Sequence, residues 1–397
     1  MRVAVIGGGI AGIACAHELN KYDIEAHVLE KREVTDGEVS DTAKIISATD
    51  EAILELASDF GLDDTVESLP LEEMGAFQDG EITTFDQMEI FLTPRSDLSL
   101  LEKGMRRIFA PMVGLDRESV RKFHDNLGDV RFDPLDRGPK NEELHDQSIR
   151  EWMDQYSEDL REMLIEPTLR AMTYDDHFEE TSADRSAASL KKVVNMVREG
   201  AFVLPNGQYD FVEGLQAELP PERLVDGAEV TDVREDGDEV HVQYRRDGDS
   251  AEETFDYAVL AAPINISAEI LDADFGTEFN RTRTVTVEGD IKEDVNLLIG
   301  GDDDYNLRSV IAVGDEHHAY VRDREDEIDV AEVYRDEPET LDSVVIPTTP
   351  RIRPGASIPD LQYSDNVLLA GDFAYYPSFN TAARTGKAAA SMIADRF

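Results

Sequence analysis

The chain has 397 residues, of which 41% are hydrophobic, and it carries 87 acidic against 38 basic residues for a formal net charge of −49. This length supports two interwoven domains with a sizeable core, and no apolar run reaches the ~20 residues that a membrane span needs. The acidic excess argues against nucleic acid as a partner, because its phosphates would be repelled.

The acidic residues are spread along the whole chain rather than gathered in a tail. Molar salt shortens the Debye length to about 3 Å and screens the self-repulsion of such a charge. The composition therefore indicates a protein from a salt-saturated cytoplasm, such as that of an extreme halophile. A cytoplasmic location is also what we expect from a first strand pattern that begins at residue 3 with no signal peptide before it. The single cysteine, Cys15, excludes an intramolecular disulfide and a cysteine-based metal site.

The first motif is a glycine-rich turn between a short apolar strand and a helix, within residues 3–30. A second strand follows and ends on Glu30, which completes the dinucleotide-binding fingerprint. Gly7 allows the tight turn, Gly9 lets the backbone approach a pyrophosphate, and Gly12 lets the helix pack close to the strand. The other reading of this motif is a glycine-rich turn that binds no ligand.

Helical spacing follows over 50–62, and 75–85 reads as a hairpin with its turn at Asp79-Gly80. Residues 97–200 look mostly helical, apart from a polar loop predicted over 132–145. Four helices are predicted there. Three cover 97–109, 160–172 and 182–197, and the fourth is capped by Asp146 or Ser148 and contains Trp152.

Strand patterns return in the second half of the chain. They appear at 223–225, 228–234 and 239–245, at 255–262, where a nearly continuous apolar run is expected of a buried sheet strand, and at 366–370. The nucleotide-binding strands are expected to come from the start, the middle and the end of the chain. Another set suits a second, antiparallel sheet: 283–287, 295–299, 309–313 and 319–322. A final helix is predicted over 381–394.

The C-terminal motif is Gly371-Asp372 at the end of the last strand, before an alanine-rich helix. Asp372 is placed to accept hydrogen bonds from the hydroxyls of a polyol chain. The N-terminus of the helix at Ala382 can face a pyrophosphate or the edge of a flavin ring through its N–H groups. Gly-Asp after a strand is a weak signal alone and a strong one beside an N-terminal dinucleotide fingerprint.

With these motifs the chain resembles the FAD-dependent amine oxidase superfamily, which includes the phytoene desaturases and protoporphyrinogen oxidases. The order of intervening segments is similar as well, for example SIREWMDQY, MLIEPTLRAMTY, LPNGQYDFVEGL and DYAVLAAP. The resemblance implies that Val230 meets the adenine through its backbone and that 261–263 belong to the FAD domain. One departure stands out: the family's Gly-Gly-Arg motif is replaced here by Asp36-Gly37-Glu38.

The expected cofactor is FAD, and the fold class is α/β with a doubly wound FAD-binding domain and a substrate domain of helices on an antiparallel sheet. The FAD-binding domain is expected over 1–75, 200–270 and 355–397, and the substrate domain over 76–199 and 271–354. The residues expected to bind FAD are Gly7, Gly9, Ile10, Ala11, Gly12, Glu30, Lys31, Val230, Gly371, Asp372, Thr381 and Ala382.

No catalytic residue is assigned, because in such enzymes the cofactor performs the redox chemistry. Lys292 falls near the position of a family lysine beside flavin N5, but a surface lysine fits its surroundings better. Tyr375 and Tyr376 suit either the face of the flavin or the core. His317-His318 point to opposite faces of a strand and lack further ligands at metal spacing, so no metal site is expected.

The expected function is an FAD-dependent oxidoreductase that transfers hydride from a C–N or C–C bond of a small molecule to flavin N5 and is reoxidised by O₂ or another acceptor. Within enzymes, the alternative is a desaturase or protoporphyrinogen oxidase type that acts on a large apolar substrate. A non-catalytic binder like the Rab GDP-dissociation inhibitors is the other class. An NAD-only dehydrogenase fits less well, because NAD lacks the polyol chain. The substrate, the electron acceptor and the oligomeric state stay open.

The charge pattern predicts that salt stabilises the protein. A melting curve in multimolar KCl is expected to give a higher Tm than one in low salt, because the salt screens repulsion among the acidic residues. Equal or greater stability at low salt would contradict the halophile hypothesis.

Overall fold

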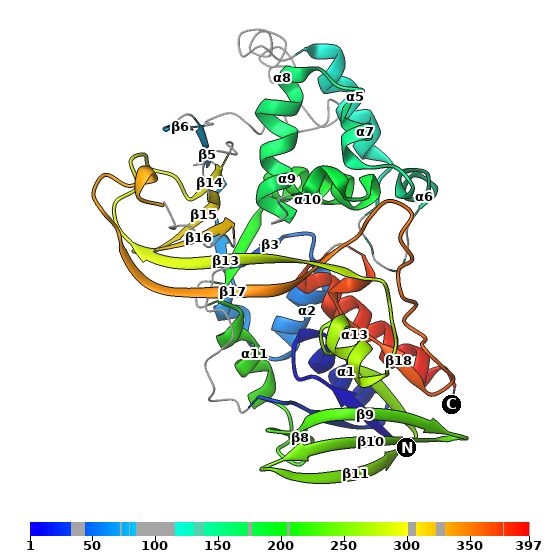
Figure 1. The fold of residues 1–397 in the computed structure, drawn as a ribbon. Coiled ribbons are helices and arrows are strands. Elements are labelled where there is room, and N and C mark those ends of the chain that lie inside the picture. The colour runs from blue at the N-terminus through cyan, green and yellow to red at the C-terminus, as the bar shows by residue number, and fades with distance from the viewer. Residues whose placement is uncertain are drawn as a thin grey trace.

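The computed structural model describes residues 1–32, 44–71, 74–78, 80–84, 116–131, 133, 135, 138–173, 177–204, 207–300, 307–322, 330–375 and 377–396. Two layered regions are stacked along the long axis of the molecule in Figure 1. One is built on a parallel sheet and holds both chain ends, and the other combines helices with a large, mostly antiparallel sheet. This mixed α/β architecture confirms the fold class predicted from the sequence.

The first region is centred on a five-stranded sheet in the order β18-β12-β1-β2-β8 with every pair parallel. Its strands come from the start, middle and end of the chain, as predicted. They are β1 (Arg2–Ile6), β2 (Glu25–Leu29), β8 (Leu224–Val225), β12 (Tyr257–Leu260) and β18 (Val367–Leu369). Near-continuous apolar residues suit strands that are covered on both faces.

Helices cover one face of this sheet and a β-meander covers the other (Figure 1). The helical side holds α1 (Ile10–Lys21), α2 (Glu51–Asp59), α11 (Gly207–Ala217) and α13 (Phe379–Ala394). The other side holds β9 (Glu229–Asp236), β10 (Glu239–Arg246), β11 (Asp249–Phe255) and α12 (Ile264–Ile270). Val3 and Val5 of β1 face the helices, whereas Ala4 and Ile6 face the meander, which is the two-residue alternation of a strand.

The second region contains a seven-stranded sheet in the order β17-β13-β16-β15-β14-β5-β6. Its strands are β5 (Met74–Gln78), β6 (Glu81–Thr84), β13 (Glu278–Glu288), β14 (Leu297–Gly300), β15 (Leu307–Val313), β16 (Glu316–Arg322) and β17 (Glu339–Arg351). The hairpin predicted over 75–85 is present as β5–β6, and it joins the sheet by a parallel pairing of β5 with β14. All other neighbours are antiparallel.

Strand β17 was not predicted, because Pro347 and Pro350 interrupt its pattern. It lies at the edge of the seven-stranded sheet, where a proline costs no ladder hydrogen bond on the outer side.

A small sheet, β3-β7-β4, consists of β3 (Lys44–Ser47), β4 (Glu67–Leu69) and β7 (Ala201–Leu204). Helix α10 (Ala183–Glu199) leads directly into β7.

The helices of the second region are α5 (Arg117–Gly128), α6 (Pro139–His145), α7 (Ile149–Met153), α8 (Glu158–Leu160), α9 (Glu166–Thr173) and α10 (Ala183–Glu199). A π-helical turn at Arg161–Ile165 joins α8 to α9.

The prediction of a loop over 132–145 was wrong for its second half, since α6 begins at Pro139. Proline is tolerated there because the first helical turn lacks N–H acceptors anyway. Ser148, not Asp146, caps α7 in a capping box with Glu151. The helix predicted over 97–109 lies outside the described residues.

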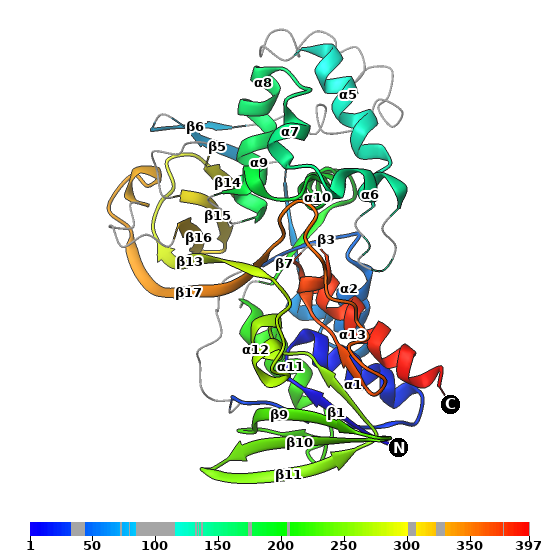
Figure 2. The same ribbon diagram turned by 45° about the vertical axis from the view of Figure 1, so that its right-hand side comes forward.

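Helices α1 and α13 pack side by side (Figures 1 and 2), and the contact depends on Gly386. A Cβ added at Gly386 would lie 2.1 Å from the carbonyl oxygen of Ala11. The two helix backbones therefore touch without an intervening side chain. This contact brings the last helix of the chain against the first one.

A methyl group at Gly386 is expected to force α13 away from α1. Gly386→Ala should lower the free energy of unfolding by about 3 kcal/mol, as overpacking against backbone does. Gly128→Ala is the matched control, because nothing lies within 4 Å of a Cβ at that helical glycine. Urea denaturation in high salt should show the loss for Gly386→Ala alone, and equal midpoints for the two variants would contradict the packing argument.

Candidate functional site

The glycine turn between β1 and α1 has the geometry that its sequence predicts. Gly7 has φ +107°, and a Cβ there would lie 3.0 Å from the backbone of Ala261. A Cβ at Gly12 would lie 1.9 Å from the carbonyl oxygen of Gly7, so the helix starts hard against the turn. Nothing lies within 4 Å of a Cβ at Gly9, which leaves open space in front of the helix N-terminus.

Glu30 directly follows β2 and lies beside this turn. One of its carboxylate oxygens accepts the Gly8 N–H at 2.5 Å and the other accepts the Arg32 N–H at 3.0 Å. Lys31 is exposed, and its ammonium pairs with Glu229 at 2.7 Å. Val230 follows on β9 and is 9% exposed. Glu30, Lys31 and Val230 thus lie on the β2 side of the glycine motif.

Gly371 and Asp372 follow β18 on the other side of the motif. The Thr385 hydroxyl links them to α13, because it lies 2.9 Å from the Gly371 nitrogen and 3.0 Å from the Gly371 oxygen. Thr385 is fully buried. Ser378 caps α13 by accepting the Thr381 N–H. Thr385 was not predicted from the sequence. The feature that could have indicated it is a hydroxyl side chain within a helix of small residues.

A cavity of about 430 Å³ joins these elements to the second region. It is lined on the nucleotide-fold side by Gly9, Ile10, Ala11, Ala261, Ala262, Pro263, Gly371, Asp372, Pro377, Ser378, Phe379 and Ala382. The remaining walls come from β3, α9, α10 and the seven-stranded sheet. Most of that lining is apolar, from residues such as Met74, Met196, Leu297, Ile299 and Ile311.

The cavity gathers six of the predicted cofactor residues, namely Gly9, Ile10, Ala11, Gly371, Asp372 and Ala382. Gly7 and Gly12 shape the turn behind it. Thr381 does not line the cavity, since its side chain is buried and faces Ser378. Asp36-Gly37-Glu38 lies outside the described residues.

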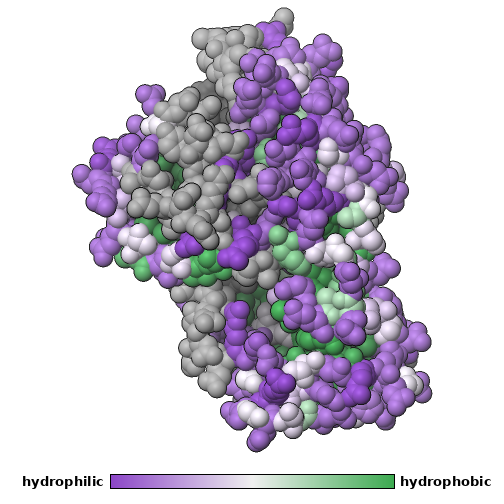
Figure 3. All heavy atoms as spheres, viewed as in Figure 1, coloured by the Kyte–Doolittle hydropathy of each residue, from purple (hydrophilic) through white to green (hydrophobic). Residues whose placement is uncertain are grey.

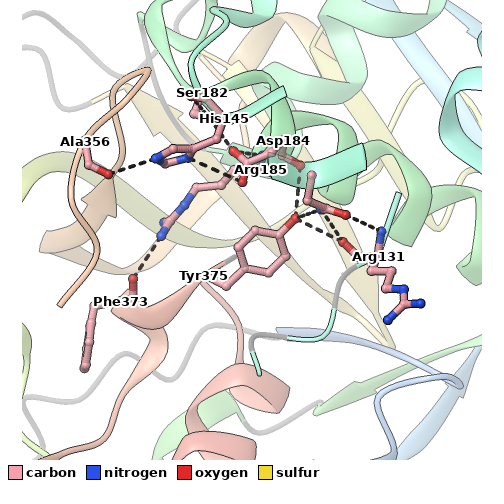
Figure 4. A network of polar contacts seen from close by, with 9 residues as sticks. Arg131, His145, Ser182, Asp184, Arg185, Ala356, Phe373 and Tyr375 are labelled. Carbon is pink, nitrogen blue, oxygen red and sulfur yellow. Dashed lines mark hydrogen bonds and ion pairs between the residues drawn. The ribbon is translucent and has the colours of Figure 1, made fainter. Parts of the chain in front are cut away.

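Tyr375 belongs to the core and not to the cavity wall. It is fully buried among helices of the second region. Its hydroxyl accepts a hydrogen bond from Asn141 and lies 3.0 Å from the carbonyl oxygen of Arg131 (Figure 4). Of the two interpretations of this tyrosine, core packing is therefore the correct one. Tyr376 lies outside the described residues.

The same network ties the C-terminal segment to α6 and α10. Figure 4 shows Asp184 in contact with both His145 and Ser182: the Asp184–His145 pair is at 3.7 Å, and the Ser182 hydroxyl donates to the Asp184 carboxylate. Arg185 donates to the carbonyl oxygen of Phe373 at 3.1 Å. The residues after Asp372 are thereby held against the helical region.

Charged residues that the sequence analysis did not single out also line the cavity. Lys192 of α10 pairs with Asp50, just before α2, at 2.7 Å, and both are less than 5% exposed. Lys44 of β3 donates to the Tyr320 hydroxyl at 2.9 Å. Burial lowers the pKa of Lys44 to about 8. In a chain with few lysines, a lysine opening an apolar strand was the only sequence signal.

Lys292, which the sequence placed near a family lysine, is exposed, donates to the Glu332 carbonyl oxygen and does not line the cavity.

His317 and His318 are buried in β16, and a ring nitrogen of His318 lies 3.3 Å from the Thr286 hydroxyl. Within the described ranges, no group of three or more His, Cys, Asp or Glu residues is arranged to hold a metal ion. None of the helices described there has the length and hydropathy to cross a bilayer.

FAD fits the residues present. Gly9 leaves a cradle that a Cβ would fill, and the N-termini of α1 and α13 both line the cavity. Their first-turn N–H groups have no intrahelical acceptor and attract phosphate. Asp372 offers carboxylate oxygens to hydroxyl groups at the end of β18. The fold and the cavity together define an FAD-binding protein.

The family follows from a comparison of sequences. The chain belongs to the DAO family, described as FAD dependent oxidoreductase, whose model matches residues 2–352. It is therefore an oxidoreductase enzyme with FAD as cofactor, which disfavours the non-catalytic binder. No curated protein sequence matches the chain.

Several solved structures are similar to this chain over its whole length, at low sequence identity. A CLA-producing fatty acid isomerase from P. acnes has 17% identity, a TM-score of 0.71 and coverage of 100% of this chain and 98% of that chain. Cyclohexylamine oxidase from Brevibacterium oxydans has 14% identity, a TM-score of 0.70 and coverage of 100% and 99%. An Exiguobacterium protein named as a protoporphyrinogen oxidase has 17% identity, a TM-score of 0.67 and coverage of 100% and 99%. At such identities the likeness shows the fold alone.

Asp372 gives the site a testable pH dependence. Burial raises the pKa of Asp372 to about 6 from 3.8. The folded protein without cofactor then binds more protons than the unfolded chain between these values, so this group's contribution to stability falls as pH rises through that window. Asp372→Asn removes the cost of burying the charge. It is expected to raise the free energy of unfolding by up to about 3 kcal/mol at pH 8 and by about half of that at pH 5.

The measurement is urea denaturation of the cofactor-free protein at both pH values. Asp360→Asn is the control, because it removes the same charge from an exposed position. A gain for Asp372→Asn no larger than that of Asp360→Asn at pH 8 would contradict a buried, charged Asp372.

Proposed function

We propose that FAD lies extended across the glycine motif, with its flavin in the cavity. Glu30, Lys31 and the Val230 backbone would hold the adenosine, because they lie together on the side of the turn away from the cavity. Gly7, Gly9, Ile10, Ala11 and Gly12 would form the pyrophosphate site. Gly371, Asp372 and Ala382 would face the ribityl chain and flavin. Thr381, whose side chain is buried and whose N–H donates to Ser378, would shape that end of the site from within α13.

The domain assignment follows the same division. We propose that 1–75, 200–270 and 355–397 form the FAD-binding domain, and that 76–199 and 271–354 form the substrate domain. All five strands of the parallel sheet fall in the first set. The seven-stranded sheet falls in the second set, apart from the first two residues of β5.

The reaction proposed is oxidation of a C–N or C–C single bond to a double bond, with a largely apolar substrate preferred. A carbon of that bond would give up a hydride to flavin N5, and the neighbouring atom would give up a proton. The observation that carries this is the cavity itself, which runs from the glycine motif to apolar walls on β14, β15 and α10. Bound FAD supplies the hydride acceptor. The chain's own residues orient the substrate and keep water from the reacting atoms. Such walls favour the desaturase or protoporphyrinogen oxidase type of substrate over a small amine.

The working environment proposed is a salt-rich cytoplasm. Support comes from the net charge of −49 and from the surface in Figure 3, where hydrophilic residues dominate the visible face. Apolar residues gather there mainly over α12 and α13. A surface of this kind is stable where salt screens its charges.

FAD binding is tested on the purified protein in high salt. The protein is expected to retain FAD through gel filtration and to show the flavin absorbance bands. Gly9→Ala should weaken FAD binding by about tenfold or more, or about 1.4 kcal/mol, because the added methyl fills the cradle. The fold should tolerate it, since nothing lies within 4 Å of that Cβ. Gly128→Ala is the control with equally open space outside the site. A colourless protein that also refuses added FAD would overturn the proposal.

A further inference from the structure

The charge of the cavity is opposite in sign to that of the chain. The whole chain has 87 acidic and 38 basic residues. The described residues that line the cavity include four bases, Lys44, Arg185, Lys192 and Arg351, and two acids, Asp50 and Asp372. An acidic protein thus concentrates cations at the surface where a small molecule would bind.

Three of these bases lie next to other protein groups. Lys192 pairs with Asp50 at 2.7 Å. Arg185 donates to the Phe373 carbonyl oxygen beside Asp372. Arg351 lies 3.9 Å from the carboxylate of Glu278. Each of these three side chains is therefore engaged by a protein group.

Lys44 differs from the other three bases. Its ammonium donates to the Tyr320 hydroxyl at 2.9 Å and lies 4.8 Å from the centre of the Tyr320 ring. Within the described part of the chain, no carboxylate forms an ion pair with it. His318, on the same face of β16 as Tyr320, is the other titratable neighbour, and burial lowers its pKa to about 4 so that it stays neutral. An ammonium has three donors, and the Tyr320 hydroxyl accepts one of them.

The wall around Lys44 is apolar. Leu297, Ile299, Ile311, Met74 and Met196 form one buried cluster with Tyr320, and all of them line the cavity. An ammonium in such surroundings is costly to keep charged without an anion, which agrees with its pKa of about 8. A bound carboxylate would repay that cost with charge-assisted hydrogen bonds.

We propose that the substrate is apolar over most of its length and carries one carboxylate, which Lys44 binds at the end of the cavity formed by β3 and β16. The inference rests on the proposed function, in which this cavity holds the substrate. It narrows the substrate class to apolar acids. A cationic amine is disfavoured, because its charge would face the ammonium of Lys44 in a low-dielectric site.

The chain's overall charge decides the salt concentration at which binding should be measured. A net charge of −49 repels an anionic substrate at long range. In molar salt the repulsion extends only about 3 Å, and contacts inside the cavity then decide the affinity. Binding experiments belong in molar KCl for this reason.

The test is calorimetric titration of the purified protein in molar KCl with three probes of equal chain length, octanoate, octylamine and octan-1-ol. Octanoate is expected to bind about tenfold to hundredfold more tightly than the alcohol, which is the range for a hydrogen bond to a charged group. Octylamine is expected to bind most weakly. Lys44→Met keeps the apolar stem and should abolish the preference for octanoate, whereas Lys44→Arg should retain it.

Lys292→Met is the matched control, because it removes the same charge from an exposed lysine outside the cavity. The flavin content of each sample, read from its absorbance, separates the two proposals. Equal affinity for the three probes in a flavin-loaded protein, or an octanoate preference that survives in Lys44→Met, overturns the carboxylate site and leaves the proposed function intact. A flavin-free protein that refuses added FAD and still prefers octanoate through Lys44 supports the carboxylate site and overturns the proposed function.

Discussion

The contact between α1 and α13 is the constraint on which the site depends. Gly386 has no space for a side chain against the Ala11 carbonyl oxygen, and Gly12 has none against Gly7. The backbones of β1, α1 and α13 are therefore locked together at close range. This packing sets the end of β18 beside the glycine turn, so that two helix N-termini and Asp372 border one cavity.

Further contacts hold the rest of the cavity to this centre. Asn380 of α13 accepts the N–H groups of Ala52 and Ile53 at the start of α2. Asp50, before the same helix, pairs with Lys192 of α10 inside the protein. Breaking a buried pair by removing one partner is strongly destabilising. The helical region is thus tied to the nucleotide fold at the cavity as well as by the Tyr375 network.

Much of the fold could be predicted from the sequence, because local patterns decide it. The apolar strands near residues 3, 258 and 368 have the composition of a buried parallel sheet, and the glycines at 7, 9 and 12 have the spacing that their packing requires. The hairpin of β5 and β6 follows from its turn residues. The predictions that failed concern prolines, whose effect depends on their place in the folded chain. Pro139 starts a helix where a loop was predicted, and the prolines of β17 lie in an edge strand that was not predicted.

The cofactor side of the site was predictable for the same reason, whereas the substrate side was not. Lys44 and Tyr320 meet across 276 residues of chain, and neither lies in a motif. The Lys192–Asp50 pair also joins segments that look like ordinary helices. Thr381 was chosen by its place in a motif, but its side chain is buried and its hydroxyl lies 3.1 Å from that of Ser378. Charges that converge only in three dimensions leave no periodic signal in one sequence.

The most direct measurement is a crystal structure of the protein grown with FAD in high salt. We expect the pyrophosphate in front of Gly9, between the N-termini of α1 and α13, with the flavin ring bordered by Asp372 and the wall that carries Lys44. Flavin density anywhere else, or a cavity between those helix ends filled by the protein's own side chains, would contradict it.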